Sequence, residues 1–69
     1  MTELEFKTDL ITAKDLLKAL DIAPSGGMAK HLIKEIGIIV NGEIFHEAGK
    51  KLRKGDEIIF DDEFHIRII

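Results

Sequence analysis

A pair of glycines at the start of a helix, followed by lysines at helical spacing, is the feature of this sequence best suited to chemistry. Ser25, a favourable N-cap residue, precedes Gly26 and Gly27, and Lys30 and Lys34 follow. The first backbone N–H groups of a helix have no partner within it, and the helix dipole makes that end partially positive. Glycine carries no side chain that would keep an incoming group away. We therefore expect a surface that binds anions, phosphate groups in particular.

The helix that must position these groups keeps its polar and apolar sides apart. At about 100° per residue, Gly27, Lys30 and Lys34 fall within roughly 60° of one another, and His31 lies on the same polar side. The apolar side consists of Ala29, Leu32, Ile33 and Ile36. Gly37 is expected to end the helix. Lysines on a polar helix face are often only solvated, so this simpler interpretation stays open.

A second group of cations follows a hairpin signal. Asn41-Gly42 is typical of a two-residue type I′ turn, which needs positive φ at both positions. A few residues later come four cations, Lys50, Lys51, Arg53 and Lys54. If this segment folds back beside the helix, six cations share one face; otherwise the run is ordinary surface charge.

The remaining sequence predicts an α+β fold with the order β-α-α-β-β-β-β, in which two helices pack on one small, mainly antiparallel sheet. Thr12, with Asp15 three residues later, is expected to cap a first helix that Pro24 breaks. The second helix runs from Ser25 to Gly37. Apolar or alternating segments predict strands at 3–7, 38–40, 43–45, 57–60 and 64–68. The polar, glycine-bearing residues 46–55 predict a loop around a short Lys50-Lys51-Leu52 segment.

Composition limits the function classes. The chain has 69 residues, 45% of them apolar, so we expect a single domain over residues 1–69. The chain has no cysteine and no apolar run long enough for a membrane span. Its acidic start is unlike a signal peptide, so we expect a cytoplasmic protein. His31, His46 and His65 are too dispersed for a metal site. We expect no catalytic residues, cofactor or metal, and hence no enzyme.

The charge distribution favours nucleic acid despite a formal net charge of −3. Residues 26–54 carry six Lys or Arg against three Glu, a net of +3, whereas both flanking segments are acidic. A local patch decides whether phosphates are attracted. The four aromatic residues, Phe6, Phe45, Phe60 and Phe64, lie in strand-like segments and are expected in the core. Without a stacking platform, folded or duplex RNA is the expected ligand.

Several segments, in this order, resemble the RNA-binding domain of small-subunit ribosomal protein S-four, also called the alpha-L RNA-binding motif. They are residues 25–30, Ile33, Gly37, 40–43, 49–52 and 55–58. The resemblance runs from about Thr12 to Phe60. It is strongest to the stand-alone bacterial form, the YaaA/YbcJ-like proteins.

The resemblance implies two helices on a small sheet, with the RNA surface on the second helix and the following hairpin. It places nine residues on or beside that surface: Ser25, Gly26, Gly27, Lys30, Lys34, Asn41, Lys50, Lys51 and Arg53. The charge pattern adds His31 and Lys54. Many relatives have arginine where this chain has Gly27 and Lys30, and basic residues at Glu47-Ala48, and losing arginine loses bidentate phosphate contacts. We therefore expect a monomer that binds structured RNA, possibly ribosomal RNA. A protein partner is left open.

Two other function classes compete. The ubiquitin-like sulfur carriers share a Val-Asn-Gly-Glu hairpin, but they need a C-terminal Gly-Gly, whereas this chain ends Arg67-Ile68-Ile69. Their thiolation chemistry is therefore unavailable. The alternative is a protein–protein adaptor without nucleic-acid binding, which would use the acidic ends or an edge strand. A titration with structured RNA would distinguish this adaptor from an RNA-binding module.

Overall fold

Two helices and seven strands follow one another in a computed structural model of the chain, which describes residues 1–69. Along the chain they are β1 (Thr2–Phe6), β2 (Leu10–Thr12), α1 (Ala13–Ala19), α2 (Gly26–Ile36), β3 (Ile38–Val40), β4 (Glu43–Phe45), β5 (Lys51–Arg53), β6 (Glu57–Phe60) and β7 (Phe64–Ile68). The α+β class, with two helices on a mainly antiparallel sheet, is confirmed. The element order is corrected by two additional strands, β2 and β5. Neither helix is long and apolar enough to cross a lipid bilayer.

The strands form two sheets, where one was expected. Five strands make a sheet in the order β1-β7-β6-β3-β4, in which β1 and β7 run parallel. The other two, β2 and β5, pair antiparallel with Ile11 opposite Leu52. The prediction of a loop over 46–55 was therefore wrong for 51–53. Local sequence did not reveal β2 and β5, because each is short and pairs with a distant segment, with no hairpin turn of the kind that marks β3 and β4.

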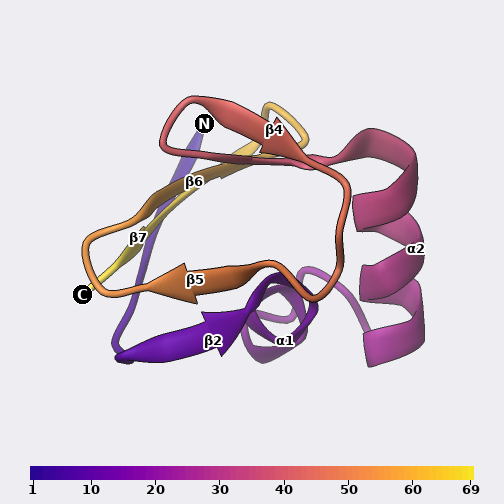
Figure 1. Cartoon of the computed structure of the whole chain (residues 1–69), viewed down its shortest axis with the longest axis horizontal. Helices are drawn as coiled ribbons and strands as arrows, with labels where there is room; N and C mark the ends of the chain where they lie inside the picture. Colours follow the sequence, from indigo (N-terminus) through magenta and orange to yellow (C-terminus); the bar gives the residue numbers. More distant parts are fainter.

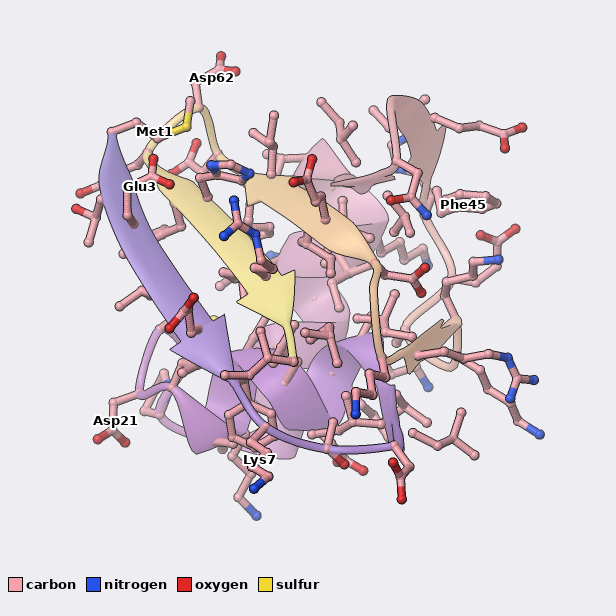
Figure 2. The ribbon with its side chains drawn as sticks, turned by 90° about the vertical axis from the view of Figure 1, so that its left-hand side faces the viewer. Met1, Glu3, Lys7, Asp21, Phe45 and Asp62 are labelled. Atoms are coloured by element: carbon pink, nitrogen blue, oxygen red, sulfur yellow. The ribbon has the colours of Figure 1, made fainter.

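The helices cover one face of the five-stranded sheet and leave the other face open (Figure 2). Alternate residues of the central strands point toward the helices, as the two-residue period requires. The buried core contains Ala13, Leu16, Leu17, Ala23, Ala29, Ile33, Ile38, Val40, Leu52, Ile58, Phe60, Ile66 and Ile68. Of the four phenylalanines expected there, Phe60 is fully buried and the others pack at the margin.

The first helix begins and ends differently from the prediction. Thr12 occupies the N-cap position, but its side chain makes no capping hydrogen bond. The N–H groups of Ala13 and Lys14 instead donate to the carbonyls of Lys50 and Ala48, at 2.9 and 3.0 Å. The expected capping box is therefore replaced by a long-range contact with the β4–β5 connection.

The end of α1 is set three residues before Pro24. Asp21 is left-handed, with φ 58°, and the N–H of Ile22 donates to the carbonyl of Leu17 at 2.9 Å. A second bond joins the N–H of Asp21 to the carbonyl of Lys18 at 3.1 Å. This pair of bonds is a Schellman motif, which satisfies the last carbonyls of the helix. Asp21, not Pro24, ends the helix.

The predictions for α2 and the hairpin are confirmed. The Ser25 hydroxyl accepts a hydrogen bond from the N–H of Met28 at 3.1 Å, which caps the helix. Gly37, with φ 78°, ends it. Asn41 and Gly42 have φ values of 52° and 86°, as a type I′ turn between β3 and β4 requires.

Candidate nucleic-acid interface

One groove gathers four of the predicted site residues. Asn41 of the β3–β4 hairpin and Lys50, Lys51 and Arg53 line a depression of about 300 Å³. The rest of its lining is Val40, Glu43, Phe45 and Asp56. We call these eight residues the basic groove. Three cations face two carboxylates there, so the groove is net positive although the whole chain is acidic.

A hydrogen-bond network holds the hairpin against the β5–β6 turn on one side of the groove. The side-chain N–H of Asn41 donates to Asp56 at 3.0 Å, and the Asn41 side-chain oxygen accepts from the N–H of Glu57 at 2.9 Å. The N–H of Arg53 donates to the other oxygen of Asp56 at 2.8 Å. Asn41 was predicted as a contact residue. In the structure its amide is engaged within the protein, where it fixes the shape of the groove.

The side chain of Lys50 places its ammonium group over the ring of Phe45 in the basic groove. Its ammonium nitrogen is 4.1 Å from the centre of the Phe45 ring, within the range of a cation–π interaction. Phe45 was expected only in the core, and its place in the groove was missed. No local signal indicated it, because the contact joins an edge strand to a connection that follows it.

The tip of α2 is open. A side-chain carbon added at Gly26 would meet nothing within 4 Å, and one at Gly27 would meet only the Ser25 hydroxyl at 3.9 Å. No other segment therefore covers the glycine pair. The N–H of Met28 is already used by the Ser25 cap, so the donors that remain at this end of the helix are the N–H groups of Ser25 and of the two glycines.

The cations of α2 lie outside the basic groove. Lys30, His31 and Lys34 are exposed on the helix, and none of them lines the groove. The connection between β4 and β5 runs alongside α2 (Figure 1), and the Nδ1 atom of His46 is 3.1 Å from the Lys34 carbonyl oxygen. This contact places the beginning of the β4–β5 connection, ahead of Lys50, next to the helix. His46 was not predicted to have this role.

Lys54 lies apart from the other cations of its segment. It lines a different depression, of about 500 Å³, together with Lys7, Glu57 and Arg67. The β5–β6 turn separates Arg53 from Lys54, because Gly55 (φ 97°) reverses the chain there. The predicted cluster of residues 50–54 is therefore divided between two surfaces.

Comparisons with known proteins give the family. The family model described as the S4 domain matches residues 4–69. The "Probable ribosome maturation protein RlbA" of Bacillus subtilis (strain 168) is 38% identical over 55 residues, which cover 80% of this chain and 78% of that protein. The family match spans α2, the hairpin and the basic groove, and the two matches together show that the chain belongs to the S4 domain family.

Proposed function

We propose that this chain is a non-catalytic module that binds structured RNA through the basic groove and the neighbouring α2. The observation that carries the proposal is the gathering of Lys50, Lys51 and Arg53 beside the hairpin. Cations concentrated at one place attract phosphates even on an acidic protein. Each phosphate that they neutralise releases condensed counterions, which favours binding.

The RNA is expected to be ribosomal. Membership in the S4 domain family supports RNA binding, as the sequence resemblance implied. The name of the Bacillus subtilis relative, a ribosome maturation protein, supports an RNA of the ribosome or of its precursors. The same comparison supports a role in the cytoplasm of a bacterium, where ribosomes mature.

The mode of recognition is expected to be shape and backbone. Phe45 is the one aromatic residue of the basic groove, and Lys50 lies over its ring. A single covered ring is not a platform on which successive bases could stack. The exposed cations Lys51 and Arg53 instead suit phosphates that a folded RNA holds at fixed positions.

The test compares two pairs of charge-neutralising substitutions. Lys51→Gln with Arg53→Gln removes two cations of the basic groove, and Lys7→Gln with Lys18→Gln removes two exposed cations elsewhere. Binding of fluorescent fragments of ribosomal RNA is measured by anisotropy over a range of KCl concentrations. Affinity falls as salt rises, and each lost phosphate contact is expected to make the slope of log affinity against log salt shallower by about 0.7–0.9.

The groove pair should therefore weaken binding and flatten its salt dependence, whereas the matched pair should change both only slightly. A third pair, Lys30→Gln with Lys34→Gln, tests whether α2 belongs to the same interface. Equal losses in the groove pair and the matched pair would show that only overall charge matters. Failure of the unaltered protein to bind structured RNA at low salt would favour the adaptor alternative.

A further inference from the structure

A second groove, on the open face of the five-stranded sheet, is apolar at its base and acidic at its rim. It has a volume of about 240 Å³, and its lining is Ile36, Gly37, Ile39, Ile44, Ile59, Asp61 and Asp62. We call this the isoleucine groove. Ile44 and Ile36 keep 55% and 43% of their surface exposed, which is unusual for two large apolar side chains in one small depression.

The strand register explains why these isoleucines meet. Ile39 of β3 pairs with Ile44 of β4 on one side and with Ile59 of β6 on the other. The row continues across the sheet through His65 to Glu3, where it becomes polar. Cross-strand partners point to the same face, so three isoleucines form a continuous strip away from the helices. Figure 2 views this open face, with Glu3 at its polar side and Asp62 at the turn above it.

Gly37 sets the floor of the isoleucine groove beside Ile44. A side-chain carbon added there would lie 2.9 Å from two atoms of the Ile44 side chain and 3.0 Å from Cε1 of His46. The glycine therefore lets Ile44 lie flat against the backbone at the end of α2. The concave shape is built into the fold, since any side chain at this position would displace Ile44.

The charges around the isoleucine groove indicate what it can bind. Asp61 and Asp62 both line it, and no cation does. Phosphates would be repelled by these carboxylates and would leave the isoleucines without apolar partners, so RNA does not fit. Two copies of this chain joined groove to groove would place four aspartates and no groove cation in one interface, where the carboxylates would repel one another. In a polypeptide with cations beside apolar side chains, the cations would face the aspartates of the rim and the apolar side chains would pack on the isoleucines of the base.

We propose that the isoleucine groove docks a partner protein through a basic segment whose lysine or arginine residues alternate with large apolar ones. The apolar side chains pack on Ile39, Ile44 and Ile59, while the cations face Asp61 and Asp62. In β4 the two surfaces separate by alternation: Glu43 and Phe45 line the basic groove, and Ile44 lines the isoleucine groove. The protein can therefore hold an RNA and a basic protein segment at the same time.

The probe is a short synthetic peptide in which lysine and arginine alternate with leucine, compared with a peptide that has serine in place of each leucine. Binding is followed by anisotropy and by NMR of isoleucine methyl groups. Ile44→Thr removes apolar surface and keeps a β-branched residue, and Leu10→Thr is its matched control at an exposed residue of β2. Asp61→Asn with Asp62→Asn removes the charges, since asparagine accepts the left-handed backbone found at both positions, and Asp9→Asn with Asp21→Asn is its control.

The leucine peptide should shift the methyl signals of Ile36, Ile39, Ile44 and Ile59, and Ile44→Thr should weaken its binding about tenfold. The asparagine pair should weaken binding and reduce its salt dependence, with both controls near the unaltered protein. Three results would overturn the proposal: equal binding of the serine peptide, equal binding by Ile44→Thr, or a dimer in sedimentation that Ile44→Thr dissolves. The last would assign the groove to a second copy of this chain.

Discussion

The side-chain nitrogen of Asn41 lies 3.0 Å from a carboxylate oxygen of Asp56, although 15 residues separate them in the chain. The same carboxylate accepts from the N–H of Arg53, so one aspartate joins the tip of the β3–β4 hairpin to the end of β5. These are the two segments between which the basic groove lies. The network therefore links the stability of the fold to the shape of its candidate RNA surface.

Replacing Asn41 with glycine should destabilise the protein by about 1–2 kcal/mol relative to the same change at Asp61, because two hydrogen bonds to the Asn41 side chain are lost. Asp61→Gly is the matched control. Asp61 has a similar left-handed backbone, with φ 56° against 52°, and its side chain makes no hydrogen bond in the structure. Glycine relieves the same backbone strain at both sites. The difference in unfolding free energy between the two variants, measured in urea, therefore gives the contribution of the Asn41 hydrogen bonds. Equal stabilities would mean that the bonds contribute nothing in water.

Replacing Thr12 with valine should stabilise the protein by about 1 kcal/mol. The Thr12 hydroxyl is buried without a hydrogen-bond partner, and valine has nearly the same shape without the polar atom. A threonine whose hydroxyl accepted a capping hydrogen bond would behave in the opposite way, because losing that bond costs about 0.5–2 kcal/mol. The sign of the change in thermal denaturation therefore distinguishes the long-range contact at the start of α1 from a capping box. Thr12→Ser, which keeps the hydroxyl, should not stabilise.

Replacing Gly26 and Gly27 with alanine should stabilise the fold while weakening RNA binding. Both residues lie in the first turn of α2 with open space around them, and alanine is the better helix former by up to about 1 kcal/mol per residue. The added methyl groups would stand between an RNA phosphate and the first N–H groups. Calorimetry and RNA anisotropy on the double variant test the two effects. If RNA binding stays the same in a stabilised protein, the helix tip is not part of the interface.

The contact between Lys50 and Phe45 should appear as a coupling in a double-mutant cycle. Phe45→Leu removes the ring and keeps an apolar side chain, and Lys50→Met removes the charge and keeps the stem. The two changes together should cost about 0.5–1 kcal/mol less than the sum of the single changes, the range for a cation–π pair that water still reaches. Urea denaturation of the four proteins gives the coupling. A value near zero would indicate that Lys50 is free in solution to reach an RNA phosphate.

Local signals in the sequence determined the elements that carry the candidate sites. The Ser25 cap, the apolar stripe of α2, the end at Gly37 and the Asn41-Gly42 turn all follow from the preferences of single residues and of neighbours within one turn. Such preferences act over a few residues, so they can be recognised without knowing the rest of the fold. The order of these signals was also enough for the family resemblance.

Tertiary structure alone decided how the elements meet. The pairing of β2 with β5, the parallel pairing of β1 with β7, and the contact between Asn41 and Asp56 join segments that lie far apart in sequence. The same long-range packing placed Lys50, Lys51 and Arg53 beside the β3–β4 hairpin, sent Lys54 to another surface, and set Ile59 beside Ile39 on the open sheet face. Residues at such separations meet only when the whole core forms, because no local preference is strong enough to offset the entropy of closing those loops.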